Sequence, residues 1–257
     1  MNKFLVFSGK ELLEAWRNSR LLILAAIFLF FAVVSPLLSR YLNEFIAMLL
    51  PPEQAGLIAT PPPHWRDAYL QFFGNLNQIG MITLILITMG VVSGEKRRGT
   101  AALMMVKGLG HTNFILSKFM VLSLVIFVVL LASVIINHSL TLALFGEGAA
   151  ANNLIFGFLV YWLFCMLILS LIILSSTLAK STLTAAAFGF LGFMAMAIIS
   201  ALPRIREAFP YTVSARAAEI TTAGYHASWL WANIVAAIAT IALFLALSIR
   251  ILKSKEL

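Results

Sequence analysis

The sequence predicts an all-α integral membrane protein with six transmembrane helices. Hydrophobic residues make up 61% of the 257 residues, charged residues only 11%, and the mean hydropathy is +0.99. Soluble domains carry about 25% charged residues, because their surfaces need polar cover. Six apolar stretches are long enough to cross a bilayer as helices, which takes about 20 residues. None alternates with the period of two that a β-barrel requires.

The six spans are expected at about 21–38, 70–94, 114–144, 154–179, 183–202 and 229–250. Each must be helical, because lipid offers no hydrogen bonds to unpaired backbone groups. Residues 1–257 then form a single transmembrane domain. The first apolar stretch starts after Arg20, is long and lacks a small-x-small cleavage site, so we expect it to remain as a span.

Residues 1–20 carry too much charge to span the bilayer and predict an amphipathic helix on the inner membrane surface. Its polar stripe is Lys10, Glu14 and Arg17, and its apolar stripe is Leu12, Leu13 and Trp16. The polar stripe follows the i, i+4, i+7 spacing of one helix face. This helix would lead directly into the first span.

The outer segment between the fifth and sixth spans, about 201–228, is long and moderately apolar. Pro203 and Pro210 interrupt any continuous helix there, and helix-capable stretches lie between and after them. We expect short helices that lie at the outer interface or re-enter the membrane before the sixth span.

Lys and Arg residues divide unevenly between the two sides that these spans define. Thirteen lie on the side of both termini: Lys3, Lys10, Arg17, Arg20, Lys96, Arg97, Arg98, Lys107, Lys118, Lys180, Arg250, Lys253 and Lys255. Five lie on the other side: Arg40, Arg66, Arg204, Arg206 and Arg216. Because loops rich in Lys and Arg stay in the cytoplasm, we expect both termini to be cytoplasmic and the protein to lie in a bacterial cell membrane. This topology explains the net charge of +8 without a nucleic-acid partner.

No group of residues in the sequence has the spacing of a catalytic or metal site. None of the four histidines forms a His-x-x-x-His or Glu-x-x-His pair, and the phosphate loop G-x-x-x-x-G-K-[ST] is absent. No span carries a charge near its middle, where proton-driven pumps and intramembrane proteases usually need one. We therefore expect neither an enzyme nor a metal or cofactor in this chain, and the energy for uphill transport must come from a partner.

Polar residues within the spans have two alternative interpretations. Asn75 and Gln78 share a face of the second span, and Asn137 lies in the third. They either line a translocation pathway or form hydrogen bonds between helices. The interhelix role is favoured.

The connection between the second and third spans is the longest and most charged inner one. Thr100 predicts an N-cap, and Gly108 can end the short helix that follows. That helix carries Leu103, Met104 and Met105. A short helix with exposed methionines, flanked by charge, suits insertion into a groove on another protein. The alternative is that it lies flat on lipid headgroups.

The same connection, "EKRRGTAALMMVKGLGHTNFILSK", resembles the signature of type-2 ABC exporter permeases, the transmembrane subunits of the ABC-2 family. The matching residues, in order and spacing, are Glu95, Gly99, Thr100, Leu103 and Lys118. Gly108 stands where proline is common, and both residues stop a helix. The layout of the whole chain is also similar, with a basic amphipathic helix, six spans, a larger outer segment before the last span and the basic tail "RILKSKEL".

The resemblance implies that the connection is a coupling helix that docks into a cytoplasmic ATPase subunit. Two permeases would pair above two such subunits, which would hold ATP and Mg²⁺. The first, second and fifth spans would line the central interface. The expected contact is 99–111, with Met104, Met105 and Lys107 foremost and His111 at its end. Glu95 is expected to pair with a base of the N-terminal helix, Lys10 or Arg17.

The expected function is therefore the membrane half of an ATP-driven exporter. Because its spans lack charge, its substrates are expected to be amphipathic peptides, such as toxins and antimicrobial peptides, or hydrophobic drugs taken from the lipid bilayer. The alternative is a scaffold or immunity protein that binds a partner without a pump cycle.

Overall fold

The computed structural model describes residues 3–17, 19–49, 62–224 and 230–254. This part of the chain contains no strand, and six of its helical segments are long and apolar enough to cross a membrane. They are Leu21–Ile46, Trp65–Arg97, His111–Phe145, Ala151–Leu178, Thr182–Ser200 and Leu230–Ser254. The predicted all-α class and the number of spans are confirmed. The predicted start of the sixth span, 229, lies outside the described residues.

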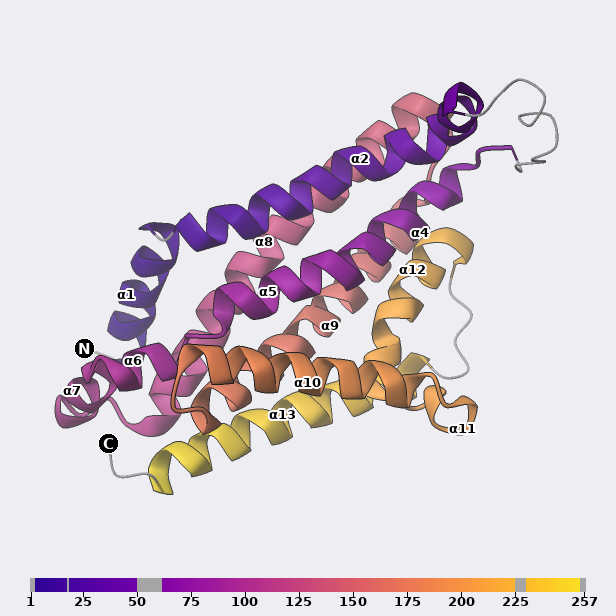
Figure 1. Cartoon of the computed structure of the whole chain (residues 1–257). Helices are drawn as coiled ribbons and strands as arrows, with labels where there is room; N and C mark the ends of the chain where they lie inside the picture. The colour runs from indigo at the N-terminus through magenta and orange to yellow at the C-terminus, as the bar shows by residue number, and fades with distance from the viewer. Residues whose placement is uncertain (1–2, 18, 50–61, 225–229, 255–257) are drawn as a thin grey trace.

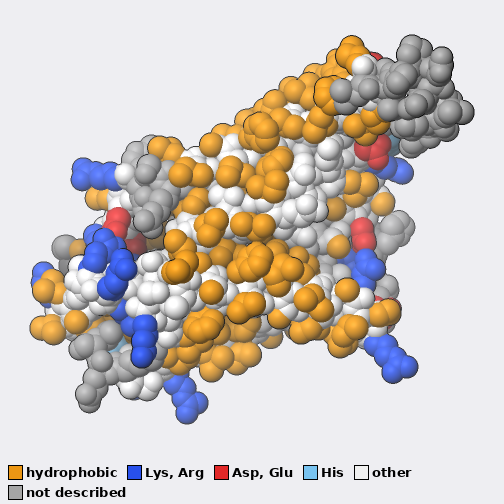
Figure 2. All heavy atoms as spheres, viewed as in Figure 1, with side chains coloured by type: hydrophobic (Ala, Val, Ile, Leu, Met, Phe, Trp, Pro, Cys, Tyr) orange, Lys and Arg blue, Asp and Glu red, His pale blue; other side chains and the backbone are white. Residues whose placement is uncertain are grey.

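The helices are α1 (Lys3–Arg17), α2 (Ser19–Leu49), α4 (Trp65–Asn75), the π-turn η1 (Leu76–Gly80), α5 (Met81–Thr88), α6 (Ser93–Arg97), α7 (Thr100–Val106), α8 (His111–Phe145), α9 (Ala151–Leu178), α10 (Thr182–Ser200), α11 (Pro203–Arg206), the 3₁₀ turn η2 (Pro210–Thr212), α12 (Val213–Ala223) and α13 (Leu230–Ser254). The long helices run alongside one another (Figure 1). One end of the bundle holds α1, α6, α7 and the last turns of α13, and we call it the basic end. Hydrophobic side chains cover the surface between the two ends, and Lys and Arg gather most densely at the basic end (Figure 2).

α9 forms the centre of the bundle. It packs against α8, α10, α12 and α13. Of its most apolar stretch, 78% is buried, compared with at most 50% in the other five spans. The outer spans therefore expose much of their apolar surface, which in a membrane protein faces lipid or a partner.

The first span is longer than predicted. The sequence-based range ends at residue 38, whereas α2 continues to Leu49. The polar residues Arg40, Asn43 and Glu44 mark where the chain becomes less apolar, but a helix leaving a bilayer needs no break there. The second span also begins earlier than predicted, at Trp65, because His64 and Asp67 form a capping box at its start.

Pro36 lies inside α2. A proline has no backbone N–H, so it leaves the carbonyl of the residue four positions earlier without its helical partner. That residue is Ala32, and the Asn137 side-chain amide of α8 donates a hydrogen bond to its carbonyl at 3.3 Å. The polar side chain of one span thus satisfies the backbone defect of another, as a bilayer environment demands.

The segment before the sixth span contains α11, η2 and α12. α12 packs against α9 and α4. The close approach to α9 depends on Gly157, because a Cβ there would clash with the Thr221 hydroxyl and lie 2.9 Å from the carbonyl oxygen of Ala217. α12 is consequently part of the packed core of the molecule.

The second span has two interruptions. The π-turn η1 separates α4 from α5, and a turn over residues 89–92 separates α5 from α6. π-turns inside α-helices often occur at functional positions. The second interruption lies at the basic end and joins the span to α7, so it positions the candidate site.

Candidate functional site

The helix α7 stands at the basic end between two glycines with left-handed backbone. Gly99 occupies the N-cap position with φ of 72°, and the Thr100 hydroxyl donates to the Glu95 carbonyl at 3.2 Å. The predicted N-cap role of Thr100 is therefore wrong, because Thr100 is already the first helical residue. Gly108, with φ of 79°, ends the helix as predicted. Its N–H and that of Leu109 bond to the carbonyls of Met105 and Met104, the pairing of a Schellman motif.

The exposed face of α7 differs from the predicted one. Met104 and Met105 are half-buried and pack against the core, so they are not the outermost side chains. Val106 is 89% exposed and Leu103 is 55% exposed. Ala101 is fully buried and sets the side of the helix that faces the core. Met104 and Met105 follow it at i+3 and i+4, on the same side. The apolar surface that α7 offers is therefore made by Leu103 and Val106.

The other predicted contact residues surround this surface. Gly99, Thr100 and Lys107 are exposed, and His111 is half-buried at the first residue of α8. The structure thus presents charged and apolar side chains together on one projection of the basic end.

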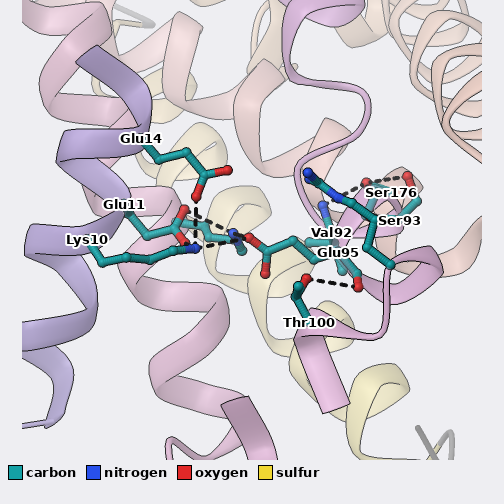
Figure 3. A network of polar contacts seen from close by, with 11 residues as sticks. Lys10, Glu11, Glu14, Val92, Ser93, Glu95, Thr100 and Ser176 are labelled. Carbon is teal, nitrogen blue, oxygen red and sulfur yellow. Dashed lines mark hydrogen bonds and ion pairs between the residues drawn. The ribbon is translucent and has the colours of Figure 1, made fainter. Parts of the chain in front are cut away.

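Glu95 of α6 is buried in an ion-pair cluster (Figure 3). The Lys118 ammonium of α8 lies 2.8 Å from Glu95 Oε1 and 2.9 Å from Glu11 Oε2 of α1. Lys118 is only 2% exposed, so water screens these pairs little. Three helices that are separate in sequence are therefore joined at one ammonium group.

Lys10 joins the same cluster from α1. Its ammonium lies 2.8 Å from Glu14, 3.2 Å from Glu11 and 3.6 Å from Glu95. The predicted pairing of Glu95 with Lys10 or Arg17 is thus found for Lys10, whereas the ion pairs of the described residues do not include Arg17, which is exposed. The Trp16 side chain lies outside the described residues.

The pKa values of the α1 groups shift in the directions that pairing favours. Burial acts to lower the pKa of Lys10, but the hydrogen bond to Glu14 and the nearby charges of Glu11 and Glu95 outweigh it and raise that pKa. The hydrogen bond from Lys10 is the main cause of the lowered pKa of Glu14. Both groups are therefore charged near neutral pH.

The cluster borders a cavity of about 110 Å³ at the basic end. One oxygen of each of Glu11, Glu14 and Glu95 lies within 4.8 Å of the others, a spacing that can hold a metal ion. Lys10 and Lys118 already supply positive charge to these carboxylates. The chemistry of the cluster is therefore that of a fixed ion-pair network that joins helices.

Ser176 of α9 fills the interruption between α5 and α6 (Figure 3). Its hydroxyl donates to the Met89 carbonyl at 2.8 Å and accepts from the backbone N–H groups of Val92 at 3.1 Å and Ser93 at 2.9 Å. The Ser93 hydroxyl also lies 3.2 Å from it, so the one proton and two lone pairs of the Ser176 hydroxyl are all engaged at this interruption. A residue of the fourth span thereby caps a helix of the second.

The polar residues predicted within the spans fall into two groups. Asn75 donates to the Ser35 hydroxyl of α2 at 3.2 Å, and Asn137 donates to the Ala32 carbonyl. Gln78 is exposed on the π-turn. Asn75 and Asn137 therefore make hydrogen bonds between helices, and Gln78 remains on the surface.

Glu11 and Ser176 were not among the predicted site residues, and Val106 lies in the predicted contact range 99–111 but was not among its foremost residues. An acidic residue among many basic ones is expected to form an ion pair, so the sequence could have pointed to Glu11. That Val106 points outward could be known only once the buried side of α7 was known. Ser176 had no sequence signal, because serines within apolar helices usually bond to their own backbone.

No protein-family model matches the sequence. Over 125 residues the chain is 26% identical to the uncharacterized transmembrane protein YxlG of Bacillus subtilis (strain 168). The alignment covers 49% of this chain and 48% of that protein, so the chain spans about half the length of the curated relative that it matches. Together with the six apolar helices, this similarity shows that the chain is a multi-pass integral membrane protein.

Proposed function

We propose that this chain is the transmembrane subunit of an ATP-driven exporter of the ABC-2 type. In this proposal it pairs with a second copy and with two cytoplasmic ATPase subunits, which bind ATP and Mg²⁺. The single observation that carries the proposal is α7: a short projecting helix with Leu103 and Val106 exposed, joined through α6 to a buried ion-pair cluster. An apolar pair surrounded by charge suits a groove on a partner protein.

The ion-pair cluster explains how movement of α7 would reach the membrane. Only two residues separate α6 from α7, and Glu95 of α6 is held by Lys118 at the base of α8 and lies near Lys10 of α1. Separating a buried charge from its partners carries a large free-energy cost, so displacement of α6 would draw α1 and α8 with it. ATP-driven movement of the partner would thereby reach the first and third spans.

We infer the orientation of the protein in the membrane from its charge distribution. Lys and Arg are densest at the basic end (Figure 2), which on the positive-inside rule is cytoplasmic. α1 then lies at the inner interface, with Leu12 and Leu13 exposed towards lipid. Both chain ends would be inside the cell.

The substrate class is inferred from the apolar character of the spans. A cavity of about 210 Å³ lies between α5 and α10, and it is lined by Ile82, Ile85, Leu86, Leu183, Ala186, Ala187 and Phe190. These helices belong to the second and fifth spans, which the resemblance puts at the interface between two copies. Amphipathic peptides and hydrophobic drugs fit such a surface better than charged solutes do.

The docking surface can be tested with Leu103→Glu plus Val106→Glu, produced together with an ABC ATPase subunit. We expect normal membrane insertion and loss of the ATPase on co-purification, because two carboxylates cannot enter an apolar groove without a large desolvation cost. Thr112→Glu, which adds a charge at an exposed position of the same end, is the control and should retain the complex. An unchanged complex in the double variant would refute docking through α7.

A further inference from the structure

The interruption at residues 89–92 exchanges hydrogen bonds with α9. In a continuous helix, the N–H of Val92 would bond to the Thr88 carbonyl and that of Ser93 to the Met89 carbonyl. In the structure both N–H groups bond to the Ser176 hydroxyl instead, and the Met89 carbonyl accepts from that hydroxyl. A side chain inserted into the backbone ladder is one of the recognised causes of a helix kink.

The same groups have a complete alternative set of bonds. If the second span straightened, Val92 and Ser93 would regain their helical acceptors. The Ser176 hydroxyl could then donate to the carbonyl four residues earlier in α9, as the neighbouring hydroxyls of Ser175 and Thr177 do at 2.8 Å each. For the Val92 and Ser93 N–H groups and the Ser176 hydroxyl, three hydrogen bonds to backbone and hydroxyl partners would be exchanged for three others. The 3.2 Å bond between the Ser176 and Ser93 hydroxyls belongs to the bent arrangement in addition.

Two more contacts hold the bent arrangement. The Lys96 ammonium donates to the Thr177 carbonyl at the end of α9 at 2.9 Å. Gly90 lies so close to α10 that a Cβ there would be 3.1 Å from the Thr182 methyl group. α6 is therefore held on one side by α9 and α10, and on the other by the ion-pair cluster with α1 and α8.

We propose that residues 89–92 form a two-state joint and that the Ser176 hydroxyl selects the bent state. In the bent state α6 and α7 are fastened to α9 and α10. In the straight state they are released from α9 and α10 and stay with α1 and α8 through Glu95 and Lys118. Discrete alternative bonding of one element is the physical basis of such switching. Use of the joint to direct force from a partner rests on the proposed function, but the joint itself is a property of this chain alone.

The joint can be tested by measuring one distance in the full chain, without any ATPase. Nitroxide labels are placed on Val106→Cys of α7 and Lys180→Cys of the α9–α10 connection, both exposed, in a Cys165→Ala background. The chain is reconstituted in lipid nanodiscs, and the label separation is measured by pulsed electron paramagnetic resonance. Ser176→Ala is expected to shift the distribution to longer distances, by roughly 5 Å or one helical turn, because it removes the selector of the bent state.

Two further variants make the result decisive. Gly90→Ala should shift the distance in the same direction, since the added methyl crowds Thr182 and alanine favours continuous helix. Ser175→Ala, which removes a buried hydroxyl bonded only within α9, should leave the distribution unchanged. A wild-type distribution in both Ser176→Ala and Gly90→Ala, or an equal shift in Ser175→Ala, would overturn the joint. Because no ATPase is present, that result would leave docking through α7 untouched.

Discussion

The ammonium of Lys118 lies between the carboxylates of Glu95 and Glu11, 2.8 and 2.9 Å away. It also lies 4.9 Å from the centre of the Phe114 ring. Through this one group α8 binds both the helix next to α7 and the N-terminal helix. The charge density of the connection between the second and third spans therefore has a structural role in addition to any role in topology.

Lys118→Met should destabilise the protein by up to about 3–5 kcal/mol, because it leaves Glu95 and Glu11, both largely buried, with only the partly exposed Lys10 as a cation. The measurement is the free energy of unfolding in denaturant in a fixed detergent. Lys107→Met, at an exposed position of the same end, should change it by less than about 0.5 kcal/mol. Adding Glu95→Gln to Lys118→Met should recover part of the loss, and no recovery would argue against charge as the cause.

Asn137 and Pro36 should be energetically coupled. Asn137→Ala removes the donor to the Ala32 carbonyl and is expected to cost about 1–3 kcal/mol, since that carbonyl is then unsatisfied. In a Pro36→Ala background the helix regains its own N–H donor to Ala32, and the same substitution should cost less. A double-mutant cycle measures this coupling, and strictly additive effects would show that the two residues act independently.

Gly157→Ala should displace α12, because the added methyl meets Thr221 and the backbone carbonyl of Ala217. We expect a loss of about 1–3 kcal/mol, typical of overpacking, and faster hydrogen exchange in 213–223. Gly74→Ala serves as the control, since no atom lies within 4 Å of its added Cβ. If Gly157→Ala leaves exchange in α12 unaltered, the close packing of α9 and α12 is not tight in solution.

Glu14 should titrate below its ordinary pKa of 4.5. A folded-state pKa below the unfolded value means that the contact stabilises α1 above the unfolded pKa and is lost as the pH falls through the folded one. Carboxyl ¹³C shifts of Glu14 report this titration directly. Lys10→Met should raise the measured pKa towards 4.5, and an unaltered titration would exclude Lys10 as the cause.

The number of spans was readable from sequence because a bilayer imposes length and apolarity on every helix. The end of α2 was not, since Arg40 and Glu44 end the apolar stretch without ending the helix. The donor that compensates Pro36, the Asn137 amide, also could not be identified from sequence, because it comes from a distant part of the chain.

The sequence predicted the short helix of the connection between the second and third spans but not its outward face. Gly108 marked the end of α7, because left-handed backbone strongly favours glycine, whereas the N-cap was assigned to Thr100 in place of Gly99. The choice between Met104 and Val106 as the outward residue depends on which side packs against the core, and a helix of 7 residues carries too short a pattern to decide it. The role of Ser176 depends entirely on tertiary contact.

The central proposal, that α7 docks into an ATPase subunit, is tested most directly by photo-crosslinking in living cells. Benzoylphenylalanine at Val106 replaces the most exposed large hydrophobic residue of α7, and the same probe at Leu191, 64% exposed in the middle of the fifth span, is the control. Mass spectrometry then identifies the crosslinked product. We expect a protein with an ATP-binding phosphate loop at position 106 and no such product at position 191. Crosslinking of position 106 to lipid alone, or to partners without an ATPase domain, would contradict the account.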